Sequence, residues 1–422
     1  MGFFSRRKHQ KVTIAVVFDI GSASVGAALT LIRPNEKPHV VYNTRRYMVF
    51  QDEFNFDRFV ASMLSTLDAV AHDIEKDGLA HLTFSKGVHR RMDQILCSYA
   101  SPWYLSQTRI IDMHDEKPFI LSKEVVERAV HKQEEEIARE GGEHYESGMG
   151  EHIDMLEKAV TDIKLNGYTV SNPYSKRATS AQFTLTVSVI ARVLRERIED
   201  TVFRVFHART IKHHSFALIA WSGITNYIGA SRDFLSIDVS GEVTDVALAH
   251  GGALLETVSF PHGSRYVLRG LNRTLHTSSG EARTLLALRE SKTVSTDIEP
   301  KLERVLTEVK TTWLTQLGEA LARFDSHAQI PGNVFLTTSD WAGPLFTSFI
   351  EDEAWARYTR THRPMQVTSI NGTLLQPFVT FREGVVTDPF LALAALYQSS
   401  MMHVTLPHVV TTPERQKELS RR

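Results

Sequence analysis

The chain has 422 residues, more than a single hydrophobic core usually serves, so at least two domains are expected. Its composition, 42% hydrophobic with a net charge of −1, is typical of a soluble globular protein and excludes whole-molecule attraction to nucleic acid. The single cysteine, Cys97, excludes an intrachain disulfide framework and fits a reducing compartment, and no apolar run is long enough for a membrane-spanning helix. We therefore expect a cytoplasmic protein without a nucleic-acid partner.

Both ends of the chain are basic. The segment "MGFFSRRKHQK", residues 1–11, is expected to be disordered, although its two Phe residues before four cations also suit weak contact with an anionic membrane surface. Residues 401–422 form a C-terminal tail that ends in "PERQKELSRR". A peripheral position at the inner membrane is the alternative that these two ends leave open.

Three strands open the first domain, over residues 12–20, 24–33 and 38–50. The segment "FNFDRFVASMLSTLDAVAHDIEKDG" then carries apolar residues at helical spacing, with Gly78 as its expected C-terminal cap. "DQILCSYASPWYLSQTRIID" indicates two further extended segments. We expect residues 12–105 to form one α/β half.

The pattern changes over residues 106–215. A charged helix with Ser122 as its N-cap runs into a glycine-rich loop near residues 141–150, and two strands flank a turn at Pro173. The segment "RVLRERIEDTVFRVF" then indicates an amphipathic helix. These elements predict a small α+β module inserted into the first half.

An internal repeat links the two parts of the chain. "FDIGSASVGAAL" is echoed by "IDVSGEVTDVAL", so that Asp19 matches Asp238, 219 positions further on. A long helix with one apolar stripe follows between residues 298 and 324, and "NVFLTTSDWAGPLFTSFI" indicates a strand, a tight loop and a helix. We expect residues 216–276 and 328–400 to form a second α/β half, with a helical subdomain over residues 277–327.

Each repeat places an Asp and a tight turn between two buried strands. Backbone N–H groups in such a turn bind phosphate oxygens, and small residues let the phosphates approach. Asp19 and Asp238 could hold Mg²⁺ through its water ligands. One such Asp alone is commonly a turn-initiating residue, but its duplication favours a site shared by both halves. The expected phosphate contacts are Gly21, Ser22, Ser24, Ser240, Gly241 and Thr244, and Asp245 is a further carboxylate expected in the site.

These two motifs resemble the phosphate motifs of the actin-like ATPase superfamily, in the branch of the cell-division protein FtsA and the pilus assembly protein PilM. Residues 106–215 occupy the place of that branch's inserted SHS2-type module, and "DPFLALAALY" resembles its second connecting helix. The resemblance implies an α/β fold of two ribonuclease H-like halves around a nucleotide cleft, with ATP and Mg²⁺ as ligands. It further implies that Thr337, Thr338 and Ser339 stand in the adenosine loop and that Glu281 belongs to the nucleotide site.

The sequence also departs from that pattern. The second phosphate loop of the family is usually a run of Gly before Thr-Thr-Asp, whereas this chain has "SGEVTD", with Glu242 near the expected phosphates. The adenosine loop, usually rich in Gly, is "TTSDWAG" here. We therefore expect weakened or regulatory ATP binding, at most weak ATPase activity, and no assigned catalytic residue.

Two functions are compatible with these features. The first is a scaffold that recruits membrane-associated machinery, with self-association possible in principle and with two partner sets: FtsZ and divisome proteins, or the tail of a pilus inner-membrane protein. The second is an ATP-dependent small-molecule kinase of the same fold, which would need a carboxylate base in the cleft. The C-terminal tail lacks the amphipathic membrane helix usual in FtsA, which favours the pilus alternative, whereas "GEARTLLALRES" favours the FtsA type.

The 19 histidines give no metal motif. His213 and His214 are adjacent, so in a strand their rings would point to opposite faces and could not share one ion. We interpret both as ordinary core or surface residues.

Overall fold

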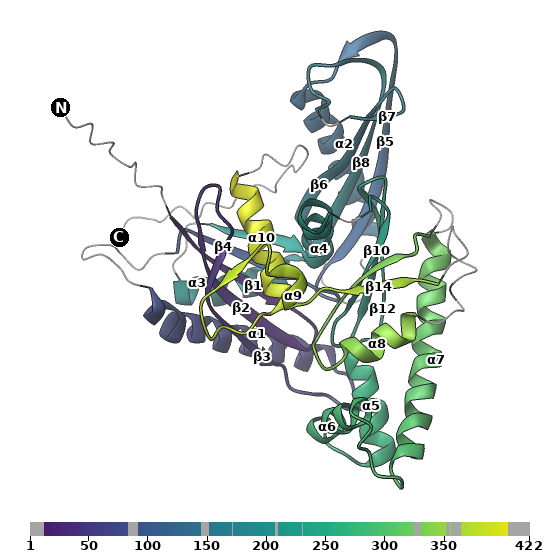
Figure 1. The fold of residues 1–422 in the computed structure, drawn as a ribbon. Coiled ribbons are helices and arrows are strands. Elements are labelled where there is room, and N and C mark those ends of the chain that lie inside the picture. Colours follow the sequence, from purple (N-terminus) through teal and green to yellow (C-terminus); the bar gives the residue numbers. More distant parts are fainter. Residues whose placement is uncertain are drawn as a thin grey trace, which may run out of the picture.

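The computed structural model describes residues 12–82, 92–144, 152–170, 172–206, 210–229, 231–324, 330–351, 355 and 364–403. The N-terminal segment expected to be disordered, the loop at 145–150 and most of the tail at 401–422 lie outside these residues. Figure 1 shows two halves side by side, each built on a sheet, with a third sheet above them. Among the described residues, no helix is both long and apolar enough to cross a membrane.

The first half is built on a six-stranded sheet in the order β15-β3-β2-β1-β4-β9. Its strands are β1 (Thr13–Ile20), β2 (Ser24–Ile32), β3 (His39–Tyr47), β4 (Gln94–Tyr99), β9 (Ile211–Ser215) and β15 (Thr380–Phe381). One face is covered by α1 (Phe56–Asp73), its π-helical and 3₁₀ extensions Ile74–Gly78 and Leu79–His81, and α3 (Arg192–Phe206).

Alternation along β1 decides where Asp19 points. Phe18 and Ile20 pack in the core under α1 and α3, whereas Val17 packs in the core with α4 (Phe216–Gly223) and α10 (Pro389–His403). Both faces of β1 are buried, which is why the strand is a continuous apolar run. Asp19 shares the face of Val17 and therefore points toward the space between the two halves.

The second half has a five-stranded sheet in the order β12-β11-β10-β13-β14. Its strands are β10 (Phe234–Val239), β11 (Thr244–His250), β12 (Ala253–Phe260), β13 (Asn333–Thr338) and β14 (Gln366–Ser369). Its helices are α5 (Ser264–Leu275), α6 (Ser279–Glu290), α7 (Glu299–Phe324), α8 (Gly343–Ile350) and α9 (Gly372–Leu375). Helices α4, with its π-helical extension Ile224–Ile228, and α10 pack between the two sheets, because residues of both sheets share one core with them.

The internal repeat is confirmed by strand order and by hydrogen bonds. In both sheets two antiparallel hairpin neighbours lie on one side of the first strand and parallel strands lie on the other. The turn after β1 is closed by a 3.1 Å bond from Gly21 N to Ser24 O. The turn after β10 is closed by a bond of the same length from Ser240 N to Val243 O, 219 positions later at both ends. The two Asp turns are copies of one structure.

The inserted module is a four-stranded sheet, in the order β5-β8-β6-β7, with one helix. Its elements are β5 (Leu105–Ile120), α2 (Lys123–His144), β6 (Ile153–Leu165), β7 (Tyr168–Thr169) and β8 (Arg177–Ala191). Ser122 caps α2 as expected, since its Oγ accepts a 3.4 Å hydrogen bond from Val125 N. The module touches the second half as well, because the hydroxyls of Thr161 and Thr186 donate to the Leu254 carbonyl at 3.3 and 3.4 Å.

Two expectations need correction. The expected module boundary at residue 215 included α3 and β9, but β9 pairs with β4 in the first sheet and α3 packs against α1. Both therefore belong to the first half, where their apolar faces are buried. Gly78 is no C-terminal cap of the left-handed type, since its φ is −62° and the helix continues through it. A Cβ there would lie 3.1 Å from the ring of Tyr42, so close packing explains this glycine.

Candidate functional site

The two Asp turns meet directly at the boundary between the halves. The Ser22 hydroxyl donates to Ser240 Oγ at 3.1 Å and accepts a 2.9 Å hydrogen bond from the backbone N–H of Glu242. The Ser22 N–H in turn points to Ser240 Oγ at 3.5 Å. The serine hydroxyl of each turn thus accepts a hydrogen bond from a backbone N–H of the other turn. The two turns therefore face each other in direct contact, as expected from a site shared by both halves.

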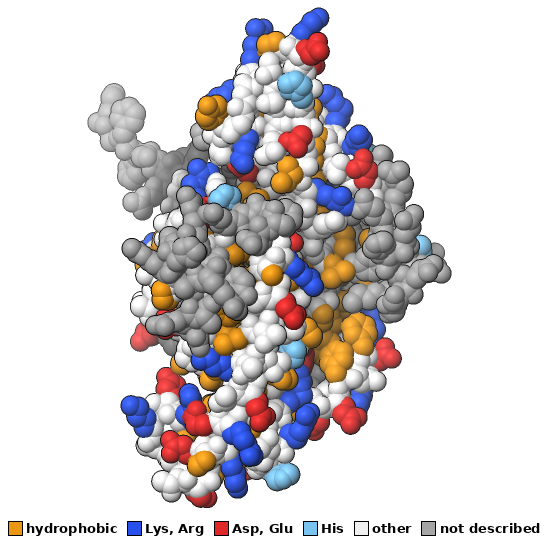
Figure 2. Space-filling view, turned by 90° about the vertical axis from the view of Figure 1, so that its right-hand side faces the viewer, with side chains coloured by type: hydrophobic (Ala, Val, Ile, Leu, Met, Phe, Trp, Pro, Cys, Tyr) orange, Lys and Arg blue, Asp and Glu red, His pale blue; other side chains and the backbone are white. Residues whose placement is uncertain are grey.

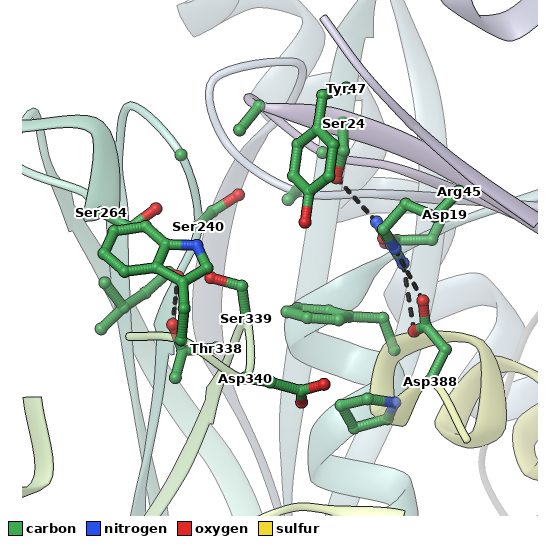
Figure 3. A pocket seen from close by; sticks show the side chains of 18 of the residues that line it. Asp19, Ser24, Arg45, Tyr47, Ser240, Ser264, Thr338, Ser339, Asp340 and Asp388 are labelled. Carbon is green, nitrogen blue, oxygen red and sulfur yellow. Dashed lines mark hydrogen bonds and ion pairs between the residues drawn. The ribbon is translucent and has the colours of Figure 1, made fainter. Parts of the chain in front are cut away.

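Beside these turns lies a cleft of about 350 Å³ between the two halves (Figure 3). Seven of the residues expected from sequence line it: Asp19, Gly21, Ser24, Ser240, Gly241, Thr338 and Ser339. Six others are not part of its lining: Ser22, Asp238, Thr244, Asp245, Glu281 and Thr337. The sequence therefore located the cleft but overestimated how many side chains face it.

Besides Ser22, three of the residues outside the cleft have hydrogen-bond partners elsewhere in the fold. The Thr244 hydroxyl donates to His262 O at 2.7 Å and accepts from the Trp313 indole at 3.1 Å. Asp245 accepts 2.6 Å and 3.3 Å hydrogen bonds from the Ser259 hydroxyl and the Ser101 N–H. Glu281 forms a capping box with Ser278 at the start of α6. These hydrogen bonds stabilise the fold around β11 and the start of α6. Glu281 is not among the residues that line the cleft.

Asp238 is the counterpart of Asp19, but its environment differs. Both of its carboxylate oxygens are buried, and neither has a hydrogen-bond partner within the part of the chain that the structure describes. Burial, and secondarily the negative charges of Asp245 and Asp19, raises the pKa of Asp238 well above its usual value. Burial without a hydrogen-bond partner thus distinguishes Asp238 from Asp19, which is bound by an arginine.

Sequence reasoning did not predict Arg45, which binds Asp19. Arg45 Nη2 lies 2.8 Å from Asp19 Oδ2, and the same guanidinium reaches Asp388 through two bonds of 2.6 and 3.1 Å. Its Nη1 donates to Ser24 Oγ at 2.9 Å, and Figure 3 shows the side chain between the two carboxylates. Burial raises the pKa of Asp19 to about 6, against the attraction of Arg45.

The position of Arg45 depends on the strand register. Gly26 in β2 is paired directly with Arg45 in β3, and a Cβ at Gly26 would lie 2.8 Å from the guanidinium. Asp388 is fixed at the start of α10, where its Oδ1 accepts a 3.1 Å hydrogen bond from Leu391 N. A signal was present in the sequence: an Arg in a strand opposite a Gly, and an Asp-Pro before an apolar helix. Neither identifies its partner without the fold.

Glu242 does not place a negative charge in the cleft, contrary to the expectation from the sequence. Its carboxylate binds Arg269, and it lies 3.4 Å from Arg265; both arginines belong to α5. Arg265 also donates to carbonyls of the first half, at 2.6 Å to Met48 and 3.1 Å to Ala23. The residue that departs from the family pattern is therefore part of a buried contact between the halves.

A second arginine in the cleft lining, Arg283, lies between aromatic rings of both halves. The Arg283 guanidinium lies 4.6 Å from the centre of the Tyr47 ring and 5.5 Å from that of Trp341. Tyr47 belongs to β3, and Trp341 follows β13 in the expected adenosine loop. Side chains therefore fill part of the space that a base or ribose would need.

Magnesium triphosphate does not fit the arrangement at the two turns. The N–H groups of Ser22 and Glu242 already have hydroxyl partners, and a Cβ at Gly241 would overlap Ala23 of the facing turn. The Asp19 carboxylate is bound by a guanidinium, and no cluster of three metal-ligating side chains occurs within the described ranges. A phosphate chain between the turns would require them to separate and Arg45 to move.

No protein-family model and no curated protein sequence matches this chain. Among solved structures, it is similar over 91% of its length to 98% of a chain of the "PilM-PilN type IV pilus biogenesis complex", with a TM-score of 0.55 and 13% identity. The chain has the actin-like ATPase fold. Weaker similarity extends to the ethanolamine utilization protein EutJ from Carboxydothermus hydrogenoformans, with a TM-score of 0.41, 10% identity and 92% and 90% of the two chains covered.

A third structure, the cytoplasmic domain of EpsL, an inner-membrane component of the Vibrio cholerae type II secretion system, has a TM-score of 0.33 and 8% identity, with 92% and 95% coverage. Of these three, the first alone exceeds a TM-score of 0.5, and it supports the fold class expected from the sequence. The actin-like halves correspond to the two sheets, and the turns after β1 and β10 lie at their boundary.

Proposed function

We propose that this chain is an actin-like scaffold protein of a type IV pilus or related assembly, which binds the cytoplasmic segment of an inner-membrane protein. The observation that carries the proposal is the similarity to the PilM chain, which leaves only 2% of that chain and 9% of this one without a counterpart. The uncovered 9% of this chain is too short to contain the whole inserted module, which spans Leu105–Ala191. The overlap favours the pilus alternative over binding to FtsZ.

The cleft supports a role that requires no nucleotide turnover. The two carboxylates nearest the first turn, Asp19 and Asp388, are both bound by Arg45, so neither is free to act as a general base. The turns that would hold a triphosphate touch one another. A kinase of this fold needs both elements, so the scaffold is the better supported function. Any ATP binding would be regulatory and would demand opening of the turns.

The inserted module is suited to present a partner surface. Its strand β6 contacts β9 of the first half, and Thr161 donates a hydrogen bond to the Leu254 carbonyl of the second half. The position of the module therefore depends on how the two halves are arranged. On the face drawn in Figure 2, Lys and Arg side chains are interspersed with Asp and Glu, and the described residues there form no continuous basic stripe. A protein segment is therefore a better partner than nucleic acid.

A binding titration tests this function. Synthetic peptides covering the cytoplasmic segments of membrane proteins encoded beside this gene are titrated into the full chain by calorimetry, with scrambled peptides as controls. We expect a pilus-type segment to bind with a Kd of about 10 μM or tighter, corresponding to roughly 7 kcal/mol. Failure of every such segment to bind, or ATP consumption with a panel of sugars and short acids, would refute the scaffold role.

A further inference from the structure

The environment of Asp19 contains a permanent cation supplied by the chain itself. Arg45 is half-buried and makes four hydrogen bonds, to Asp19, Ser24 and both oxygens of Asp388. The cost of burying these groups would be high if they were unpaired, but the guanidinium binds both oxygens of Asp388 and Oδ2 of Asp19, leaving only the buried Oδ1 of Asp19 without a hydrogen-bond partner within the described residues. Gly26 provides the space that this side chain needs.

The groups joined by Arg45 come from distant parts of the chain. Asp19 ends β1 and Asp388 begins α10, the helix that packs between the two sheets. Arg45 thus connects the first Asp turn to that helix. A hydrated metal ion at Asp19 would have to displace the guanidinium, which stays charged at every accessible pH.

We propose that Arg45 takes the place of a metal ion at Asp19, so that the cleft of this protein stays closed without magnesium or nucleotide. Its single positive charge pairs with both Asp19 and Asp388, and the Ser22–Ser240 contact holds the turns together where phosphates would otherwise bridge them. In this arrangement the two halves have one resting geometry, independent of ATP. The inference goes beyond the scaffold function and does not depend on any partner.

Removal of the internal cation tests the proposal. Arg45→Met keeps much of the side-chain volume but leaves Asp19 and Asp388 without their guanidinium. Arg46→Met is the matched control, because Arg46 is the next residue of the same strand, forms a two-bond ion pair with Asp73, and is exposed. Thermal unfolding of the full chain is followed in EDTA, in MgCl₂, and in MgCl₂ with ATP.

We expect the wild-type melting temperature to be the same in all three buffers. Arg45→Met should melt roughly 5 °C lower or more in EDTA, because two carboxylates then lack their cation. MgCl₂ should recover part of that loss, since the ion can now reach Asp19. Arg46→Met should lose less and should not respond to magnesium.

Two results would overturn the proposal. If MgCl₂ with ATP raises the wild-type melting temperature and Arg45→Met abolishes that rise, Arg45 is a phosphate contact and not a substitute for the metal. If Arg45→Met behaves as Arg46→Met does, the guanidinium has no special role in the cleft.

Should Arg45→Met fail to fold, Arg45→Lys retains the charge and loses the planar fork, and it should melt below wild type with no magnesium response. Small-angle scattering of the wild type gives an independent answer. A radius of gyration that is unchanged by MgCl₂ and ATP supports the proposal, and compaction on their addition contradicts it.

Discussion

Two adjacent histidines of β9 point to opposite faces of the first sheet and reach different carboxylates. His213 lies with Nδ1 2.8 Å from the Tyr99 hydroxyl and with Nε2 3.1 Å from Glu199 Oε1. His214 lies with Nδ1 2.9 Å from Glu157 Oε2. The alternation of side chains along a strand requires this separation. The two rings are therefore core residues with separate partners, as the sequence indicated.

Burial of His213 makes the stability of the protein depend on pH. Desolvation lowers the pKa of His213 below its usual 6.5, against the opposing attraction of Glu199 and with smaller contributions from Arg195 and His214 that also lower it. The unfolded chain therefore binds a proton that the folded histidine does not. Stability should fall as the pH drops below about 6.5, by at most about 1.4 kcal/mol per pH unit from this group.

Replacement of the ring isolates this contribution. His213→Phe keeps a buried ring but cannot titrate, so its unfolding midpoint should change less between pH 7 and pH 5 than that of the wild type. His72→Phe is the control, because His72 is an exposed residue of α1. Thermal unfolding across this pH range is the measurement. Parallel curves for His213→Phe and wild type would show that His213 does not cause the dependence.

Single residues are also where the sequence was least informative. Glu281 was expected in the nucleotide site because of its place in a family motif, but the same residue satisfies the capping box of α6. Arg45 was not expected, because its role arises from Gly26 across the strand and from Asp388, 343 residues away. A sequence shows a residue's type and local spacing, whereas its electrostatic partners depend on the tertiary fold.

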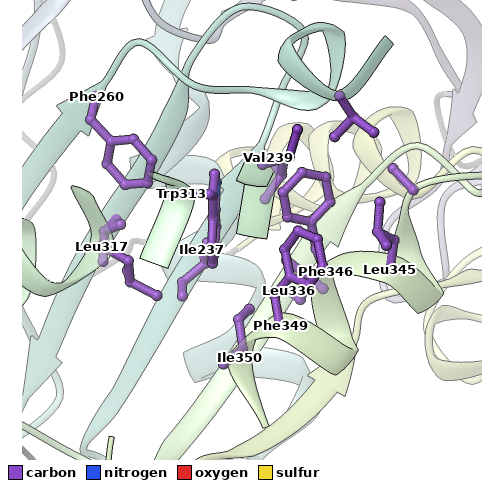
Figure 4. Packing of buried hydrophobic residues seen from close by; sticks show 14 of the residues in the cluster. Ile237, Val239, Phe260, Trp313, Leu317, Leu336, Leu345, Phe346, Phe349 and Ile350 are labelled. Carbon is purple, nitrogen blue, oxygen red and sulfur yellow. The ribbon is translucent and has the colours of Figure 1, made fainter. Parts of the chain in front are cut away.

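At the scale of elements, helix α7 shows why apolar periodicity predicts well. The expected stripe is buried along α7, and its central residue, Trp313, has no exposed surface. Figure 4 shows Trp313 among aromatic residues of the second half; ring centres of Phe260, Phe346 and Phe349 lie 5.9, 5.1 and 6.3 Å away. The stripe specified both the helix and the face that packs on the sheet.

Truncation of Trp313 should destabilise the second half strongly. Trp313→Ala removes a tryptophan with no exposed surface from this core, together with its hydrogen bond to Thr244, and we expect a loss of about 3–5 kcal/mol. Thr315→Ala, at an exposed position of the same helix, should change stability by less than about 0.5 kcal/mol. Urea unfolding monitored by circular dichroism measures both. A loss below 1 kcal/mol for Trp313→Ala, or equal losses for both variants, would disagree with the packing described.

The type of each element, helix or strand, was predictable, but the sheet or domain to which it belongs was not. Strand β9 and helix α3 follow the inserted module directly in sequence, and their amphipathic pattern does not state which sheet they join. The structure pairs β9 with β4, which lies more than 100 residues earlier in the chain. Pairing of distant strands is a property of the whole fold, so the expected boundary at residue 215 was wrong at this point.

At the scale of the whole molecule, the repeat made the architecture predictable. Two Asp turns whose matching residues lie 219 positions apart indicated two similar halves, and the strand orders of both sheets agree with that expectation. The state of the cleft could not be predicted in the same way. It depends on contacts between the copies, such as Ser22 with Ser240 and Arg265 with Met48, that join residues more than 200 positions apart.

Replacement of Arg265 tests how much the polar contacts between the two halves contribute to holding them together. This side chain is 4% exposed on α5 and donates to the Met48, Ala23 and Val49 carbonyls of the first half, while it also lies beside Glu242. Arg265→Met should cost about 3–5 kcal/mol, because Glu242 loses a buried partner and the carbonyls lose their donor. Hydrogen exchange should then rise at the turn Ser22–Ser24 more than inside β1, since the turns separate while each sheet stays folded. Arg273→Met, at an exposed position of the same helix, is the control. If the two variants exchange and unfold alike, the halves are held together by the shared core around α4 and α10 and not by the polar contacts at the cleft.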